Sequence, residues 1–371
     1  MLQVTRPHIY EEDIPLFIDR PLDQIKLEIG YGLITLCKDK TKDGLIPQLT
    51  ELRERLFEDY GLSVPLIHIQ DNAELQPYEY RILLKGVEKG RFQLKPGYIL
   101  AIPFNEDIPE YTDSTYEKTK EPSFSMNAYF VPENESIKFK DQGFVCITAA
   151  KIISKHIHTL IEINKTEILN QSMVRRLVNN VRVKNSDVVS DVFFKNSFSI
   201  SNMKTLLNLL LEENVPIHDM ETILEGIADN LKELKKPYEL VEKVREKLAF
   251  SIVNKLSDEN KCLHVIKVAT ELSDFFYENT IEPSLENDIP CICIESLKRR
   301  KVLTKAAELS SKMIEKGFAP VFLCIQPIRL GLFDFLQDKI SGCICLSAEE
   351  LKIVAKEIQV VVEEELSLDE E

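Results

Sequence analysis

The sequence predicts a protein of several subdomains and mixed class: a split α+β unit of RRM-like strand order with an inserted subdomain, a helical bundle, and a C-terminal α/β unit. Three observations support this prediction. The chain has 371 residues, more than one hydrophobic core usually organises. Apolar residues recur at every second position in some segments, as in strands, and at every third or fourth position in others, as in helices. Strand and helix patterns then alternate toward the C-terminus, which is typical of α/β units.

The first unit follows a proline-rich arm that shows no sustained apolar period and is predicted to be extended. In QIKLEIG, apolar and charged residues alternate, which predicts a half-buried strand. An apolar stripe from Leu45 to Tyr60 predicts a helix that ends at Gly61. Two more strand patterns, PLIHIQ and YRILLKG, complete the strand–helix–strand–strand order of a small α+β sandwich.

An inserted subdomain is predicted next, because five prolines interrupt the pattern between residues 96 and 142, around the strand-like segment NAYFV. The strand pattern returns at GFVCI. The following segment, AAKIISKHIHTLI, carries the apolar stripe of a helix. We therefore expect the first unit to resume at GFVCI.

The remaining chain divides into a helical part and an alternating part. Three helical patterns end or begin near Pro216 and Pro237, where the first turn of a helix tolerates proline. From Leu263 onward strands and helices alternate, and the last nine residues, with six acids, predict a solvated tail. The predicted boundaries are 1–21 for the arm, 22–95 and 143–164 for the split unit, 96–142 for the insertion, 165–258 for the helical unit, 259–362 for the α/β unit and 363–371 for the tail.

Charge and cysteine content limit the classes of function and the cellular compartment that we expect for this chain. With 46 basic against 61 acidic side chains, the formal charge is −15, which disfavours binding to nucleic-acid phosphates. No apolar run approaches the ~18 residues of a membrane-spanning helix, and the start lacks the order of a signal peptide. Most of the eight cysteines lie in apolar runs, so we expect reduced, buried thiols in a cytosolic compartment. The two Cys-Ile-Cys pairs alternate as strand residues do, which favours packing over zinc binding.

No motif predicts a catalytic, metal or cofactor site. The sequence contains no phosphate loop, GxGxxG, HExxH or GxSxG pattern. His156 and His158 lie two apart on a predicted helix and point in different directions, so they cannot hold one metal together. A soluble α/β enzyme with a carboxylate or nucleotide site remains an alternative, as does an RNA-binding module with the same βαββ order.

Two basic clusters interrupt the acidic background. They are Arg175, Arg176, Arg182 and Lys184, and then the run from Lys298 to Lys301. Each is either a solvated helix face or a contact with an acidic neighbour, such as another copy of this chain.

Several segments, in order and over roughly residues 16–345, resemble the cytoplasmic domain of type III secretion export-gate proteins, the FlhA/SctV family. They include PLDQIKLEIGYGLI, EPSFSMNAYFV, GFVCITAAKIISKHIHTLI, LLNLLLEENVPIHDMETILEGIADN and APVFLCIQPIRLGLFDFL. The resemblance implies a non-enzymatic scaffold without cofactors, with four subdomains in the order predicted above. It also implies that the membrane half of such a protein is missing from this sequence.

The resemblance further implies partners and a location. Family members form a nine-membered ring under the export channel, at the cytoplasmic face of the bacterial inner membrane. There they receive export substrates with their chaperones from the cytosolic ATPase complex, and they work beside other membrane proteins of the export apparatus. We expect the same partners here and no nucleic acid. The sequence does not distinguish a flagellar from a virulence-associated system.

The resemblance places a docking site in the insertion. The family motif D-P-x-F-G-L-x-A-x-W aligns with EPSFSMNAYF, so its functional acid and aromatic ring fall on Glu121 and Phe124. Flagellar members bind chaperone–substrate complexes in a hydrophobic dimple there. Lys155 replaces the family's threonine before His-Leu, which favours a different set of chaperones. The alternative is that Phe124 is only a core residue of the insertion.

Contacts between subunits are expected in two places. The helical unit supplies one, with Arg175 and Arg176 as the charged residues. The N-terminal arm supplies the other through an apolar cluster, Ile14, Leu16 and Phe17, because apolar residues in an arm without a core of its own favour docking.

Overall fold

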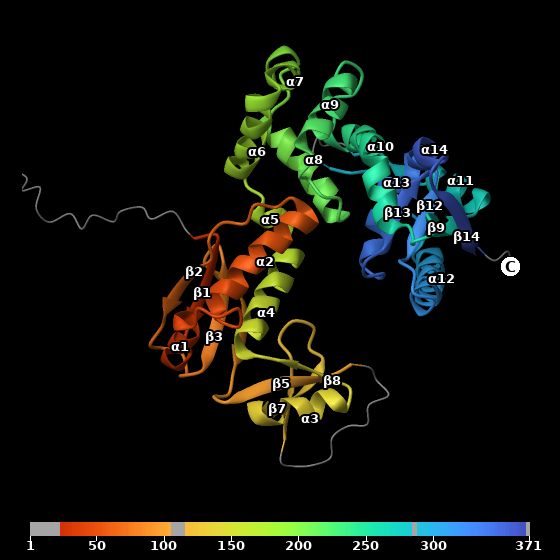
Figure 1. Ribbon diagram of the computed structural model, residues 1–371. Coiled ribbons are helices and arrows are strands. Elements are labelled where there is room, and N and C mark those ends of the chain that lie inside the picture. Colours follow the sequence, from red (N-terminus) through yellow and green to blue (C-terminus); the bar gives the residue numbers. More distant parts are fainter. Residues whose placement is uncertain (1–22, 105–115, 284–287, 369–371) are drawn as a thin grey trace, which may run out of the picture. The chain divides into compact units, whose positions relative to one another are not determined.

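The computed structural model describes residues 23–104, 116–283 and 288–368 (Figure 1). The predicted arm contacts Ile14, Leu16 and Phe17 lie outside these residues. The described residues form two compact units, one within Met1–Leu52 and Pro65–Ile163 and the other within Arg53–Val64 and Asn164–Glu371. No helix of the described chain has the length and apolar character needed to cross a membrane.

The first sheet of the first unit follows the predicted element order. Its strands lie in the order β2 (His68–Asp71), β1 (Ile25–Ile29), β3 (Glu79–Leu84), β4 (Val87–Gln93), with β1 parallel to β2 and antiparallel to β3. Alternate residues of β1 are fully buried, as the apolar period predicts. Short helical segments, η1 (Tyr31–Leu33) and α1 (Ile34–Lys38), follow β1.

Two helices accompany this sheet. They are α2 (Leu45–Tyr60) and α4 (Ala149–Ile163), which lie side by side in Figure 1. The hydroxyl of Ser154 on α4 donates a hydrogen bond to the Gln48 carbonyl on α2, 3.2 Å away. The apolar stripe of α4, which includes Ile153, Ile157 and Ile161, is fully buried.

A second, antiparallel sheet contains the predicted insertion. Its order is β6 (Glu117–Lys120), β7 (Asn127–Pro132), β5 (Tyr98–Pro103), β8 (Phe144–Ile147). The segments η2 (Glu133–Glu135) and α3 (Ser136–Asp141) connect β7 to β8. Phe139 of α3 packs edge-on against the rings of Tyr116 and Phe144 in the core of this sheet.

The expectation that the first unit resumes at GFVCI is wrong in one respect. This segment forms β8, which pairs with β5 of the second sheet and not with a strand of the first. Within the predicted segment 143–164, the chain returns to the first sheet only at α4, where His156 contacts Tyr80 of β3. The cause is physical: alternation predicts that a segment is a strand, but it carries no information on which strand it will pair with.

The second unit begins with a helical part. It comprises α5 (Lys165–Ile168), α6 (Gln171–Lys184), α7 (Ser186–Ser190), η3 (Asp191–Lys195), α8 (Ile200–Glu212), α9 (Met220–Asn230) and α10 (Pro237–Leu256). Asn170, Ser199 and Asp219 cap the starts of α6, α8 and α9 with side-chain oxygens. On α10, the predicted stripe from Val241 to Ile252 is buried, and Pro237 occupies the first turn.

A parallel sheet completes the second unit, in the order β13 (Ile344–Ser347), β12 (Val321–Cys324), β9 (Cys262–Val268), β14 (Gln359–Leu366). Its helices are α11 (Thr270–Glu278), α12 (Ser296–Glu315), α13 (Gln326–Gln337) and α14 (Ala348–Val354), and β10 (Thr280–Ile281) pairs with β11 (Cys291–Ile292).

The prediction of a solvated C-terminal tail is wrong for its first residues, because Glu363–Leu366 form the end of β14 beside β9. Hydrogen bonding to β9 and burial of Leu366 outweigh the acidic composition.

The expectation that the cysteine thiols are buried also needs a correction. Cys324, Cys343 and Cys345 are buried, as expected. The pair Cys291 and Cys293 is exposed, while Ile292 between them is buried. The expected burial is therefore wrong for this pair, because Ile292 packs into the core and the two thiols face outward.

Candidate protein-docking site

The segment EPSFSM forms a tight turn between β6 and β7. The Glu121 carboxylate accepts hydrogen bonds from the backbone N–H groups of Ser123 at 2.9 Å and Phe124 at 2.6 Å. The N–H of Glu121 donates to the Met126 carbonyl, and the N–H of Ser125 donates to the Glu121 carbonyl. Ser125, at the position of the family's glycine, has a left-handed φ of 58°. Glu121 is only 3% exposed, so it shapes the turn from within.

Phe124 projects from this turn into solvent. Its side chain is 58% exposed, and the neighbouring Met126 is 42% exposed. Lys155, on α4, places its ammonium nitrogen 5.4 Å from the centroid of the Phe124 ring, within cation–π range. The structure thus brings Glu121, Phe124 and Lys155 together. The alternative interpretation of Phe124 as a core residue is wrong.

Behind the turn, Tyr80 and His156 join β3 to α4. The Tyr80 hydroxyl and His156 Nδ1 are 3.0 Å apart, and both side chains are buried. Burial lowers the pKa of His156 to about 4, although the charge of Glu121 acts in the opposite direction. A Cβ added at Gly90 of β4 would lie 2.5 Å from His156 Nε2, so close contact between helix and sheet requires glycine there. His156 is a packed, hydrogen-bonded residue and supports the site from within.

The predicted inter-subunit arginines lie in the second unit. Arg175 and Arg176 are exposed on α6, and Arg176 lines a cavity of about 250 Å³ beside Gly61 and Met173. The second basic cluster lies on α12, where Arg299 stacks 4.6 Å from the centroid of the Phe335 ring. Both clusters lie on helices, and Arg299 is the half-buried member of the second one.

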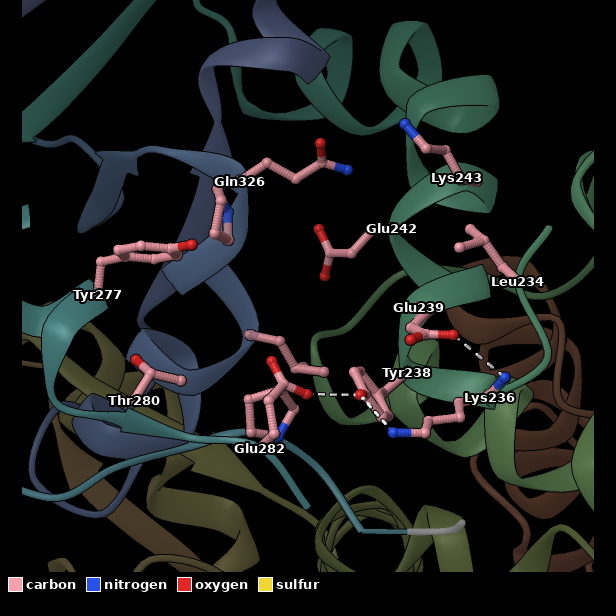
Figure 2. A pocket seen from close by; sticks show the side chains of 13 residues that line it. Leu234, Lys236, Tyr238, Glu239, Glu242, Lys243, Tyr277, Thr280, Glu282 and Gln326 are labelled. Carbon is pink, nitrogen blue, oxygen red and sulfur yellow. Dashed lines mark hydrogen bonds between the residues drawn. The ribbon is translucent and has the colours of Figure 1, made fainter. Parts of the chain in front are cut away.

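A larger pocket in the second unit was not predicted from the sequence. Figure 2 shows it between α10, the β10–β11 hairpin and the start of α13, with the Glu242 carboxylate near its middle. The Tyr238 hydroxyl donates to Glu282 at 2.6 Å. The cavity has about 690 Å³ and is lined by Leu234, Lys236, Tyr238, Glu239, Glu242, Lys243, Tyr277, Thr280, Glu282, Pro290, Gln326, Pro327 and Leu330.

Beneath this pocket, a buried group of charges joins four helices. Arg329 of α13, fully buried, donates to Glu213 at the end of α8 at 3.0 Å and to Glu242 of α10 at 2.8 Å. Arg245 contacts Glu213 at 3.2 Å and Glu350 of α14 at 2.9 Å. Burial raises the pKa of Glu242 against the attraction of Arg329, whereas for Glu350 the two arginines outweigh burial and lower the pKa. One sequence signal could have located this group, because Arg329 is the lone cation in the apolar helical run Gln326–Gln337.

Within the described ranges, no three or more His, Cys, Asp or Glu side chains converge in a way that could hold a metal ion. The shifted carboxylates Glu242 and Glu350 are held in ion pairs with buried arginines. The exposed Phe124 ring with the adjacent Lys155 ammonium is a surface feature suited to recognition. The turn that carries this ring lies on a scaffold of small α+β, helical and α/β parts.

Comparison with known proteins identifies the family of this chain. The model of the FHIPEP family matches residues 10–356, so the chain belongs to the FHIPEP family. The flagellar biosynthesis protein FlhA of Treponema pallidum is 30% identical over 324 residues, covering 86% of this chain and 45% of that protein. The chain thus spans about half the length of the curated relatives it matches.

Solved structures show the same fold. The complex of Chlamydia pneumoniae CdsV and CdsO contains a chain that matches with a TM-score of 0.76 and 20% identity, covering 93% of this chain and 97% of that one. Nonameric EPEC SctV-C matches with a TM-score of 0.71 and 17% identity, covering 93% and 98%. At these identities the likeness establishes the multi-subdomain fold.

Proposed function

We propose that this chain is the cytoplasmic ring domain of a type III export gate, which docks chaperone–substrate complexes and passes substrates to the membrane channel. The observation that carries the proposal is Phe124, an exposed ring on a turn fixed by the buried Glu121 carboxylate. A preorganised aromatic side chain loses little entropy on binding and makes a strong anchor in a partner's apolar groove. Family membership supports this role and a location at the inner face of the bacterial inner membrane.

The Lys155 ammonium over the Phe124 ring gives the anchor a positive charge. A partner that covers the ring must therefore also accommodate this cation, by an acidic or carbonyl group. We infer that the preferred chaperone–substrate complexes present an apolar groove with an acidic rim. This chemistry differs from that of family members with a threonine at the same place.

The domain is also proposed to assemble with copies of itself. The nonameric SctV-C structure supports a nine-membered ring. Exposed Arg175 and Arg176 on α6, together with the N-terminal arm, would supply contacts to the acidic neighbour. The solved complex of CdsV with CdsO supports a second partner, for which we propose the stalk of the ATPase complex. Other membrane proteins of the export apparatus complete the proposed set.

Replacement of Phe124 by alanine tests the docking site. Because the ring is exposed, F124A should change the free energy of unfolding by less than about 0.5 kcal/mol. Binding of chaperone–substrate complexes from the same secretion system, measured by pull-down and calorimetry, should weaken at least about tenfold. F250A is a matched control, since Phe250 is 50% exposed on α10. Equal binding by wild type and F124A would overturn the assignment.

A further inference from the structure

The exposed cysteines Cys291, on β11, and Cys293, just after it, are not used by the proposed docking function. Its two Sγ atoms are 3.9 Å apart, and Cys293 donates a weak S–H hydrogen bond to Cys291. Both residues are exposed, because the buried Ile292 fixes the strand so that its neighbours face outward together. In contrast, Cys324 and Cys345 are buried, and burial raises the pKa of each. Cys291 and Cys293 are therefore the favoured cysteines for thiol chemistry in the described part of the chain.

The geometry allows a disulfide, under strain. Residues two apart on an extended strand have Cα atoms about 6.6 Å apart. Disulfides span Cα separations of about 4.4–6.8 Å, so this pair lies near the upper limit. The sulfurs, now 3.9 Å apart, must come to about 2 Å. A bond formed under such strain is easily reduced, which is a property of labile rather than structural disulfides.

We propose that Cys291 and Cys293 form a reversible redox dithiol, oxidised by exchange with a small-molecule disulfide. In the first step a thiolate at Cys293 attacks one sulfur of the oxidant, forming a mixed disulfide and releasing one thiolate. The Cys291 thiolate then attacks Cys293 Sγ, closing the Cys291–Cys293 disulfide and releasing the second thiolate. The two cysteines lose two protons and two electrons, and the oxidant becomes two thiols.

The order of attack follows from the surroundings of the two sulfurs. Burial, and then the hydrogen bond from Cys293, raise the pKa of Cys291. This shift disfavours the Cys291 thiolate, so we assign the second step to Cys291, as the resolving residue. Its contact with Cys293 keeps it within reach of the mixed disulfide.

Closing the bond should also affect the hairpin. The N–H of Cys293 donates to the Asn279 carbonyl at 2.9 Å, and Thr280 pairs with Ile292. Thr280 and Pro290 belong to the wall of the pocket in Figure 2. Drawing the two cysteines together strains this ladder, so amide hydrogen exchange in β10 and β11 should accelerate on oxidation.

The test is mass spectrometry of the folded chain treated with glutathione disulfide, alkylated and digested with trypsin. Peptide 268–298 contains Cys291 and Cys293 and no other cysteine. In wild type it should lose two hydrogens and carry no glutathione, and reduced glutathione should reverse this. In C291S, glutathione should stay attached to Cys293.

Two results would overturn the proposal. One is a wild-type peptide that carries separate adducts on both cysteines. The other is a disulfide that forms as fast in the urea-unfolded chain as in the folded chain, since the folded placement would then contribute nothing. C291S replaces an exposed residue, and thermal unfolding equal to wild type verifies that this variant is folded.

Discussion

The direction of the Phe124 ring depends on one carboxylate. Glu121 accepts two backbone hydrogen bonds within the turn and is shielded from solvent. Family resemblance located both residues, but it gave them one shared role. The structure separates the roles: Phe124 is available to a partner, whereas Glu121 positions it. No local sequence pattern predicts that a glutamate side chain will turn inward and accept hydrogen bonds from backbone N–H groups of its own turn.

Removing this carboxylate should loosen the turn. E121A leaves two N–H groups without their acceptor, and we expect a loss of about 2 kcal/mol in the free energy of unfolding. E121Q keeps an acceptor oxygen and should lose less. Urea denaturation measures both, and binding of chaperone–substrate complexes should weaken in the same order. Unchanged stability and binding in E121A would contradict the positioning role.

His156 should make stability depend on pH. Its pKa is about 4 in the folded chain against an ordinary value of 6.5, so the unfolded chain binds the proton more readily. Its contribution is complete above pH 6.5 and is lost as the pH falls toward 4. The stability difference between wild type and H156Q, from urea denaturation, should therefore shrink between pH 7 and pH 4.5. A difference independent of pH would contradict a buried, neutral His156.

At the scale of elements, the helices α8, α10, α13 and α14 are held together by the buried charges around Arg329. A charge removed from water is costly to leave without a partner. These contacts join residues up to 116 positions apart, so local periodicity could not predict them. The interior of the second unit is specified by these long-range ion pairs as well as by apolar packing.

Breaking this group should be much more costly than breaking a surface pair. R329M leaves Glu213 and Glu242 without their main partner and should lower the free energy of unfolding by about 3–5 kcal/mol. K247M removes the exposed pair with Asp229, at 2.8 Å, and should lose less than about 1 kcal/mol. Equal effects of the two substitutions would show that the buried group does not hold the helices together.

Prediction from sequence succeeded for elements that have one apolar face. It failed where the position of a strand depends on which other strand it pairs with. The stripes of α4 and α10 and the alternation of β1 gave those elements correctly. The three helical patterns do not include α6, although its buried residues Met173, Val174, Val178 and Val181 recur at helical spacing. The pattern predicted a strand at β8 and only a run of acids at the end of β14. The positions of these two strands depend on their partners, β5 and β9.

For the whole molecule, ring assembly should depend on the basic face of α6. At a net charge of −15, copies of the chain repel one another, so exposed arginines are favourable points of contact. R175E/R176E should weaken self-association more than tenfold by sedimentation, and salt should weaken wild-type association. K352E/K356E changes the net charge equally, on and just after α14. Equal association of both double variants would remove α6 from the proposed interface.

The proposed function requires this domain to assemble into a ring and to offer surfaces to other proteins. Sedimentation velocity over rising protein concentration, with electron microscopy of the same samples, tests it most directly. We predict a closed species of nine copies that dissociates on dilution. A chain that stays monomeric at every concentration, with no rings in the images, would contradict it.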